Sequence, residues 1–552
     1  MYTDDKASQI VLALLKKYGI KRIVISPGTT NVPISRAVQL DSFFEAYSVV
    51  DERGAAYFAT GLAFATGEPV AISCTGATAS RNYLSGLTEA YYRNLPVIAL
   101  TSQHHSPAHM DLLPQVTDRR VSQNDVKRFA ALLPMVKDEQ DMRTCVTLVN
   151  KALQTTLSGG GGPVHINIPV SNLYGFTTKT LPDVTKISYH TAEDLPADAL
   201  SKELAGKKVG VFIGAHRPFS RESLAAVNRF VKAYDATVFY DHTSSYTGRN
   251  RILTSVAGDL LQISDLPDVI VDLGSVCGDY SAARLFRGRP TWRISEDGEY
   301  YNRQNLQDLR RVFACSERLF FDSLSQFSGG GRYFSSLKKQ VASIKIPTLP
   351  LSNTYISSRL ATAVPKRSFL HMGILNSLRN MDFFEVDKTV ITSCNVGGFG
   401  IDGALSTLIG QSVSDTSRLA FCLLGDLAFF YDMNALGIRH VNRNLRILMV
   451  NNGRGAEFRL NKDLERQWGS DTDEFISAAG HFGSCQAWSE AMGFRYLRAT
   501  TKDEFDALLG DFCNPDIAAF PKPVVFEVFT DIADEQQALH HIRSMNQPIK
   551  KA

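Results

Sequence analysis

The amino-acid sequence lacks three features that would assign it to particular classes of protein. Its eight cysteines include no Cys-x-x-Cys pair, so a zinc site of that kind is unsupported. No uninterrupted apolar stretch reaches about 18 residues, which argues against a membrane-spanning helix. The formal net charge is only +3 and there is no long basic run, so we expect neither nucleic acid nor a membrane surface as a partner.

The N-terminus also lacks the basic and then apolar pattern of a signal peptide. Residues 1–6 are polar and acidic instead, which argues against a secretory signal. Cys74, Cys394 and Cys422 lie within or beside apolar strand-like runs, and we interpret the cysteines as reduced core residues. These observations favour a cytoplasmic location. The content of 44% hydrophobic and 21% charged residues is ordinary for a globular protein.

Short apolar runs alternate with helix-like segments along the whole chain. Helical patterns at 52–66 and 83–92, for example, flank the strand-like run at 70–74. This alternation is typical of the α/β class, in which parallel sheets are covered by helices. The length of 552 residues and two breaks rich in Gly or Pro predict three domains. We place these domains at residues 1–180, 195–335 and 350–552.

Two polar residues follow strand-like runs near the C-terminus. Asp426 follows the apolar run at 419–424, and Asn452 follows a second run at 445–450. A carboxylate and an amide at the ends of nearby strands can hold one hard cation through oxygen, and Mg²⁺ keeps open positions for phosphate. A Gly-Asp pair alone is common in turns, but the combination predicts a metal-diphosphate site.

In the first domain, an acidic residue opens a helix directly after a strand-like run. Glu52 lies in an Asp-Glu-Arg-Gly segment, and it is followed by a small-residue loop at 74–80 and by Asn82. Taken alone, a carboxylate at a helix start is ordinary compensation of the helix dipole. In this order, the motifs resemble the pyrimidine-binding domain of thiamine-diphosphate enzymes. The third domain resembles the diphosphate-binding domain of the same enzymes.

This resemblance implies residues that contact the pyrimidine end of the cofactor. Glu52 would contact the aminopyrimidine ring and exchange a proton with a ring nitrogen, a task that burial of its carboxyl group would suit. Gly76 and Asn82 would also contact the cofactor.

For the diphosphate end, the resemblance implies a magnesium site. Asp426 and Asn452 would bind Mg²⁺ through their side chains, and Arg454 would supply its backbone carbonyl as a third ligand. Backbone amides near Gly425 and Leu427 would help to cradle the diphosphate.

The segment at 400–407 makes the likeness narrower. It is very similar to a segment of the SEPHCHC synthases of the menaquinone pathway, as are the segments at 26–28, 162–167 and 431–434. The likeness spans nearly the full chain and is weakest in the middle domain. It implies that Ile401 lies beneath the cofactor and forces its bent shape, although an Ile here could be only a core residue.

The departures from that family concern the substrate pocket. Several arginines of the family bind an anionic donor and an anionic acceptor, and arginine does this through paired hydrogen bonds. Here Thr30, His104 and Val396 stand where the family carries arginines, while Arg379 is kept. We therefore expect a conserved type of cofactor site and an altered substrate pocket. The candidate substrate residues are Thr30, Arg379, Val396 and Glu457.

Three polar residues are candidate catalytic groups beside Glu52. His104, His105 and Gln115 fall where related enzymes place residues that face the reactive end of the cofactor, and neutral histidine can relay protons near pH 7. The alternative is that they are polar loop residues in solvent, and Glu457 could likewise belong to a solvated helix face. In the middle domain, no GxGxxG motif follows the strand-like runs at 208–214 and 268–274, so FAD is not expected. We interpret this domain as mainly structural.

Taken together, the sequence predicts an enzyme that uses thiamine diphosphate and Mg²⁺ for carbon–carbon bond chemistry. The first interpretation is decarboxylation of a 2-oxo acid donor, with pyruvate as a plausible example, followed by carboligation to an acceptor carbonyl. This would make the protein a transferase or carboligase. The alternatives are a non-oxidative decarboxylase that releases an aldehyde, which is a carboxy-lyase, and a non-catalytic subunit that binds the cofactor. The resemblance also implies a homodimer or homotetramer with active sites at the subunit interface.

Overall fold

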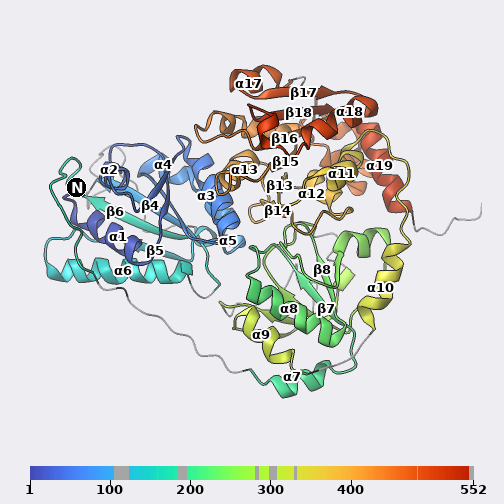
Figure 1. Cartoon of the computed structure of the whole chain (residues 1–552), viewed down its shortest axis with the longest axis horizontal. Helices are drawn as coiled ribbons and strands as arrows, with labels where there is room; N and C mark the ends of the chain where they lie inside the picture. Colours follow the sequence, from blue (N-terminus) through green and yellow to red (C-terminus); the bar gives the residue numbers. More distant parts are fainter. Residues whose placement is uncertain are drawn as a thin grey trace, which may run out of the picture. The chain divides into compact units, whose positions relative to one another are not determined.

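The protein contains three six-stranded sheets in which every strand pairing is parallel (Figure 1). The computed structural model describes residues 1–104, 123–157, 160–184, 186, 195–279, 285–297, 308–327, 332–481 and 483–545. Helices lie between many of the successive strands, as between β1 and β2 or β7 and β8, so the predicted α/β class with parallel sheets is confirmed.

The described chain forms two compact units. Unit 1 consists of Met1–Ala192 together with two later segments, Leu405–Ser414 and Asn434–Val441. Unit 2 consists of Glu193–Ala404, Asp415–Met433 and Asn442–Ala552. Unit 1 therefore contains the first sheet, and unit 2 contains the second and third sheets.

The first sheet has the strand order β2-β1-β3-β4-β6-β5. Its strands are β1 (Arg22–Ile25), β2 (Glu45–Ser48), β3 (Val70–Thr75), β4 (Val97–His104), β5 (Phe129–Leu132) and β6 (Val164–Val170). The hydrophobic core on one face comes from α1 (Lys6–Lys17), α2 (Val32–Leu40) and α6 (Glu139–Leu157). The remaining helices are α3 (Glu52–Thr66), α4 (Ala77–Asn82) and α5 (Leu84–Tyr92). Of these, α3 packs against both α5 and β3.

Helix α3 also packs closely against α13 (Ala404–Ser412), which explains why this distant segment belongs to unit 1. A Cβ atom added to Gly61 of α3 would lie 2.0 Å from the backbone oxygen of Thr407. In the reverse direction, a Cβ atom added to Gly410 would lie 2.0 Å from the backbone oxygen of Phe58. Two glycines thus allow the two helix backbones to touch.

The second sheet has the strand order β12-β11-β10-β7-β8-β9. Its strands are β7 (Val209–Ile213), β8 (Thr237–Tyr240), β9 (Arg251–Leu253), β10 (Val269–Leu273), β11 (Pro290–Ile294) and β12 (Asp308–Phe313). The helices of this part are α7 (Ala197–Leu204), α8 (Arg221–Tyr234), α9 (Glu317–Leu324) and α10 (Tyr333–Ala342).

Strand order in the second sheet reverses between β7 and β10, and ligands of open parallel sheets commonly bind at such a point. Here the two following loops hydrogen-bond to each other. Ala215 donates its N–H to the Val276 carbonyl at 2.9 Å, and Ser275 donates to the Ala215 carbonyl at 2.8 Å. These loops therefore close directly over the strand ends.

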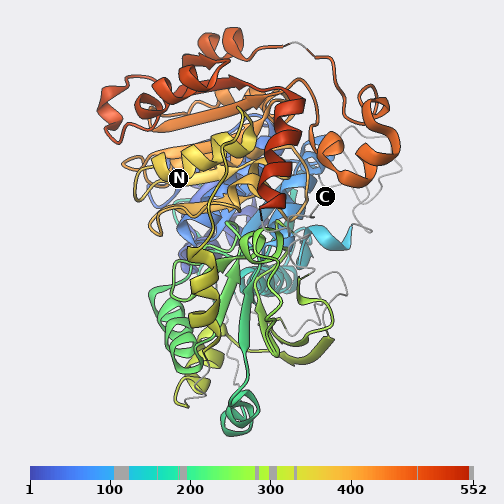
Figure 2. The same cartoon turned by 90° about the vertical axis from the view of Figure 1, so that its right-hand side faces the viewer.

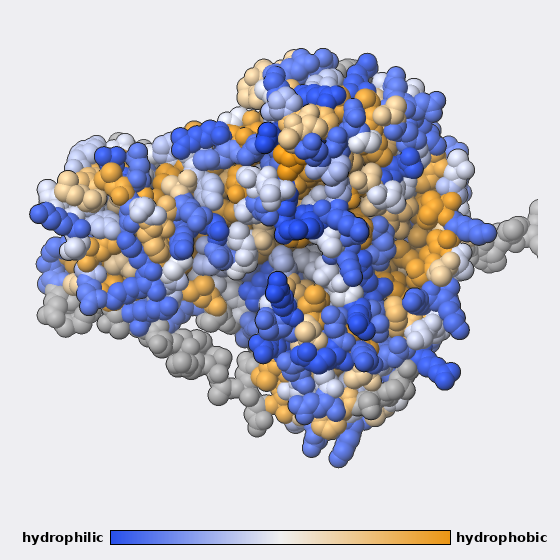
Figure 3. Space-filling view, viewed as in Figure 1, coloured by the Kyte–Doolittle hydropathy of each residue, from blue (hydrophilic) through white to orange (hydrophobic). Residues whose placement is uncertain are grey.

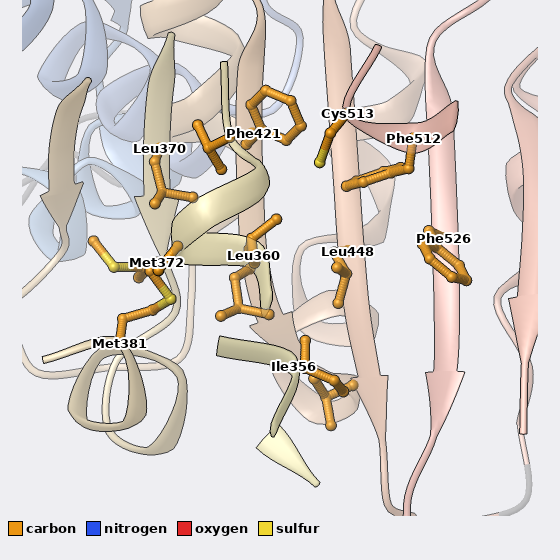
Figure 4. Close-up of a cluster of buried hydrophobic side chains, with 14 of the residues drawn as sticks. Ile356, Leu360, Leu370, Met372, Met381, Phe421, Leu448, Phe512, Cys513 and Phe526 are labelled. Carbon is orange, nitrogen blue, oxygen red and sulfur yellow. The ribbon is translucent and has the colours of Figure 1, made fainter. Parts of the chain in front are cut away.

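The third sheet has the strand order β14-β13-β15-β16-β18-β17. Its strands are β13 (Phe369–Met372), β14 (Ile391–Cys394), β15 (Ala420–Gly425), β16 (Leu445–Asn451), β17 (Arg495–Ala499) and β18 (Val524–Phe529). Its core is built from these strands and from α11 (Asn353–Ala363), α12 (Asn376–Met381) and α18 (Lys502–Phe512). Figure 4 shows this core, in which Ile356 and Leu360 of α11 face strand residues such as Leu448.

The C-terminal helix α19 (Ile532–Ser544) runs beside α11 in the same unit (Figure 2). Among the described residues, no helix is long and apolar enough to cross a membrane. On the face in Figure 3, hydrophilic residues are interspersed with smaller groups of hydrophobic ones.

Candidate cofactor-binding site

Asp426 lies at the carboxyl end of β15, where the chain enters the short helix α14 (Asp426–Tyr431). Its side chain is only 2% exposed. The carboxylate accepts backbone N–H groups from Leu427 at 2.7 Å, Asn452 at 3.0 Å and Gly453 at 2.6 Å. Burial raises the pKa of the Asp426 carboxyl group, while these donors and the nearby His481 oppose that change. The acid thus ties together the ends of two adjacent strands.

Asn452 follows β16, the neighbour of β15 in the sheet. Its side-chain oxygen Oδ1 is buried and has no hydrogen-bond partner among the described residues. A buried polar atom without a partner is costly, and a bound cation would satisfy it. The backbone carbonyl of Arg454 accepts one N–H, from Ala456 at 3.0 Å, and a carbonyl has two lone pairs. The set of carboxylate, amide and carbonyl oxygens fits Mg²⁺.

The segment from Gly453 to Gly480 leaves the sheet edge and returns to it. Its ends meet, because Gly480 donates its N–H to the Gly453 carbonyl at 3.2 Å. Inside it, Asp473 accepts hydrogen bonds from Arg454 at 2.6 Å and from Arg459 at 3.0 and 2.9 Å. Neither this network nor His481 was predicted from the sequence, because no short motif or spacing indicates pairing between these positions.

Gly425 and Leu427, the residues predicted to bind the diphosphate through nearby backbone amides, differ in their surroundings. A Cβ atom added to Gly425 would meet nothing within 4 Å, so space is open there. The N–H of Leu427, however, is already bonded to the Asp426 carboxylate at 2.7 Å. Gly425 therefore offers open space to a ligand, whereas the Leu427 N–H already has an acceptor within the protein.

Ile401 lies in the loop between β14 and α13 and is 40% exposed. The loop contains two residues with left-handed backbone, Phe399 at φ 56° and Gly403 at φ 81°. Asn395 donates from its side chain to the Gly403 carbonyl at 3.4 Å. The exposed side chain of Ile401 is therefore presented by a constrained loop.

Val396 lies in a different environment from Ile401, since it is fully buried in the core of the third sheet. A Cβ atom added to Gly278 would lie 3.2 Å from Val396 Cγ1 and 2.3 Å from Leu378 Cδ2. Val396 is thus a tightly packed side chain in this structure.

Arg379 and Glu457 contact each other, although the sequence named them separately. Arg379 of α12 donates from Nη1 to Oε1 of Glu457, the first residue of α15 (Glu457–Leu460). Asn376 holds the same carboxylate from the other side. In the orientation that satisfies its amide, it donates to Glu457 Oε2 at 3.0 Å and accepts the Glu457 N–H at 2.9 Å.

In unit 1, Glu52 is the first residue of α3 and its side chain is half-buried. The preceding Asp51 caps the helix by accepting the Arg53 N–H at 3.0 Å. Asp51 also accepts a hydrogen bond from Asn434 at 2.6 Å. Tyr83 is buried, and burial is the main reason why its pKa is raised well above its usual value. The neighbouring Cys74 and Glu52 raise this pKa further.

The other predicted contacts of the pyrimidine end lie around α4, which follows β3. Gly76 is buried and precedes the first residue of α4, while Asn82 is exposed at its last residue. Gly28 lies against the end of β3, because a Cβ atom there would be 2.0 Å from Thr75 Cγ2. The loops after β1 and β3 are therefore in close contact.

Thr30 and His104 lie at the same edge of the first sheet. Thr30 is buried and donates from Oγ1 to the Ser102 carbonyl at 2.7 Å, so its hydroxyl braces the end of β4. His104 is the last residue of β4 and is exposed. His105 and Gln115 lie outside the described residues.

Comparison with known proteins agrees with these features. The family model described as thiamine pyrophosphate enzyme, N-terminal TPP binding domain, matches residues 5–126. Over longer stretches the chain is similar to proteins named 2-succinyl-5-enolpyruvyl-6-hydroxy-3-cyclohexene-1-carboxylate synthase. It is 28% identical to the protein of Phocaeicola vulgatus, covering 96% of each chain. It is 29% identical to that of Desulfotalea psychrophila, covering 93% of this chain and 96% of the relative.

Residues 5–126 thus match the N-terminal cofactor-binding domain of thiamine pyrophosphate enzymes, and the parallel sheets of the fold are in keeping with that match. The chain's similarity over 96% of its length is to the synthases named above, and SEPHCHC synthase is the short form of their name.

Proposed function

We propose that the enzyme uses thiamine diphosphate and Mg²⁺ to decarboxylate a 2-oxo acid and to join the remaining fragment to an acceptor carbonyl. The observation that carries this proposal is the buried carboxylate of Asp426 at the end of one strand, beside the amide oxygen of Asn452 at the end of the adjacent strand. Within the described part of the chain, this oxygen has no hydrogen-bond partner. The match of the N-terminal domain to thiamine pyrophosphate enzymes supports it.

When bound, thiamine diphosphate supplies a nucleophilic carbon and accepts the electrons that are released when CO₂ leaves a 2-oxo acid. In our proposal, Asp426 and Asn452 hold Mg²⁺ with their side chains, and Arg454 does so with its carbonyl oxygen. Glu52 holds and releases a proton at the aminopyrimidine ring from its half-buried position at the start of α3. Ile401, Gly425, Gly76 and Asn82 contact the cofactor.

The assignment of groups near the substrate is part of the same proposal. His104, exposed at the end of β4, relays protons at the reacting carbonyl, together with His105 and Gln115. Thr30 and Val396 shape the pocket through packing, since both are buried.

We further propose that the active form is a homodimer or homotetramer. Glu52 belongs to unit 1 and Asp426 to unit 2, and in our proposal one cofactor is held by Glu52 of one copy and Asp426 of another. Two equivalent sites then arise in each symmetric dimer.

Screening of 2-oxo acids tests the function. Purified protein is incubated with thiamine diphosphate and Mg²⁺ and with pyruvate, branched 2-oxo acids or 2-oxoglutarate, and CO₂ release is followed. We expect release from at least one donor, and loss of most turnover in Glu52→Gln. Glu68→Gln is the matched control, because Glu68 is an exposed partner of Arg22.

Product analysis separates the possible outcomes. With an added aldehyde, carboligation gives a hydroxyketone, whereas a simple decarboxylase releases only the free aldehyde. Full turnover in Glu52→Gln would refute the assigned proton transfer. Binding of the cofactor without CO₂ release from any donor would indicate a non-catalytic subunit.

A further inference from the structure

Arg379 and Glu457 form an ion pair that is largely shielded from water. Their side chains are only 14% and 19% exposed. Glu457 is fixed by Arg379 and by both groups of the Asn376 amide. Such a closed arrangement differs from the flexible surface ion pairs that contribute little to stability.

The pair lies at the same edge of the third sheet as the candidate metal site. Helix α12, which carries Arg379, follows β13, and β13 pairs with the strand that ends before Asp426. On the other side, Glu457 follows Gly455 by two positions, and a Cβ atom at Gly455 would lie 3.6 Å from Leu427 Cδ1. Both partners are therefore held next to the segments that bear Asp426 and Asn452.

The charges in this pair determine what a substrate can place there. A guanidinium group without an acidic partner binds a carboxylate through two parallel hydrogen bonds. In this chain Glu457 already supplies that carboxylate, so the pair has no net charge. An incoming carboxylate would have to displace Glu457 and would then be repelled by it.

We infer that Glu457 determines donor specificity by neutralising Arg379, so that the enzyme accepts 2-oxo acids with an uncharged side chain and rejects those with a second carboxylate. This inference rests on the proposed function. Glu457 is a positioning residue in this account, since it acts through Arg379. The alternative is that the pair only braces α12 against α15.

The test compares Glu457→Gln with Glu465→Gln. Glu465 is a matched control, because it is also a glutamate paired with an arginine, Arg459, in the segment from Gly453 to Gly480. Arg459 also binds Asp473. Calorimetry with cofactor-free protein measures the binding of 2-oxoglutarate and of pyruvate. We expect Glu457→Gln to bind 2-oxoglutarate at least about tenfold more tightly than wild type, with pyruvate binding and the control unchanged.

A second variant shows whether Arg379 is responsible for the gain. Adding Arg379→Met to Glu457→Gln is expected to return 2-oxoglutarate affinity to the wild-type value. In the enzyme loaded with cofactor, the ratio of kcat/KM for 2-oxoglutarate to that for pyruvate is expected to rise by a similar factor in Glu457→Gln. Circular dichroism establishes that each variant is folded.

Two results would overturn the inference. One is unchanged 2-oxoglutarate affinity in folded Glu457→Gln, which would leave the pair a structural brace. The other is a wild-type preference for 2-oxoglutarate over pyruvate. If neither protein releases CO₂ from any donor, the proposed function fails, but the calorimetric comparison still decides the role of Glu457.

Discussion

Replacement of Gly61 by alanine tests the close packing of α3 against α13. The added Cβ atom would lie 2.0 Å from the Thr407 oxygen and 2.8 Å from the Thr407 carbonyl carbon. Real Cβ atoms do not approach other atoms closer than 3.0 Å, and the obstacle is backbone rather than a flexible side chain. The two helices must therefore separate by about 1 Å, which loosens the packing of a fully buried helix face.

The net effect depends on two opposing contributions. Overpacking of a core costs about 1–3 kcal/mol, whereas alanine in place of glycine in a helix gains about 1 kcal/mol. At Gly61 the obstacle is backbone, so the cost falls in the upper part of this range, about 2–3 kcal/mol. We therefore expect a net loss of about 1–2 kcal/mol in the free energy of unfolding. Gly510 of α18 is the control, because a Cβ atom there meets nothing within 4 Å and only the gain applies.

Hydrogen–deuterium exchange measures this loss where it occurs. A loss of this size should accelerate exchange of the protected amides of α3 by about 5–30-fold in Gly61→Ala. Exchange in Gly510→Ala should be unchanged or slower in α18. Wild-type exchange of α3 in Gly61→Ala would refute the contact between the two helix backbones.

Two further perturbations have defined outcomes. Glu535 is buried, and burial raises its pKa from 4.5 to about 7. The folded state therefore binds its proton more tightly than the unfolded state, so its contribution to stability is complete below about pH 4.5 and is lost as the pH rises through 7. We expect the free energy of unfolding of Glu535→Gln, relative to that of wild type, to rise by up to about 3 kcal/mol between pH 4.5 and 8. Chemical denaturation at several pH values measures this difference, and a difference that does not change with pH would contradict the raised pKa. Asp473→Asn removes the charge that binds Arg454 and Arg459. Limited proteolysis should therefore cut the segment from Gly453 to Gly480 faster in this variant than in wild type. Equal rates of cleavage would show that the network does not stabilise this segment.

Much of the fold could be predicted because local sequence determines it. The helix expected at 52–66 coincides with α3, and the strand-like runs at 70–74 and 445–450 are each one residue shorter than β3 and β16. Continuous apolar runs between amphipathic segments leave few alternatives to parallel sheets buried on both faces. The grouping of Leu405–Ser414 with unit 1 could not be predicted, because it depends on two glycines far apart in the chain.

The candidate site was predictable where its residues directly follow strands. Asp426 and Asn452 come together because β15 and β16 are neighbours, and the carboxyl ends of parallel strands meet at one edge. The pairing of Arg379 with Glu457 joins residues 78 positions apart, and no periodic pattern relates them. Its consequence for specificity became visible only from the contacts.

Calorimetric titration with thiamine diphosphate tests the central claim most directly. Wild-type protein is titrated with Mg²⁺ present and again with EDTA, and Asn452→Ala is titrated with Mg²⁺. This substitution removes an oxygen without a hydrogen-bond partner among the described residues, so it should weaken cation binding rather than the fold. The account predicts binding by wild type with Mg²⁺ and at least about tenfold weaker binding in the other two titrations. Equal affinity in all three would contradict the assignment of Asp426 and Asn452 as the metal-diphosphate site.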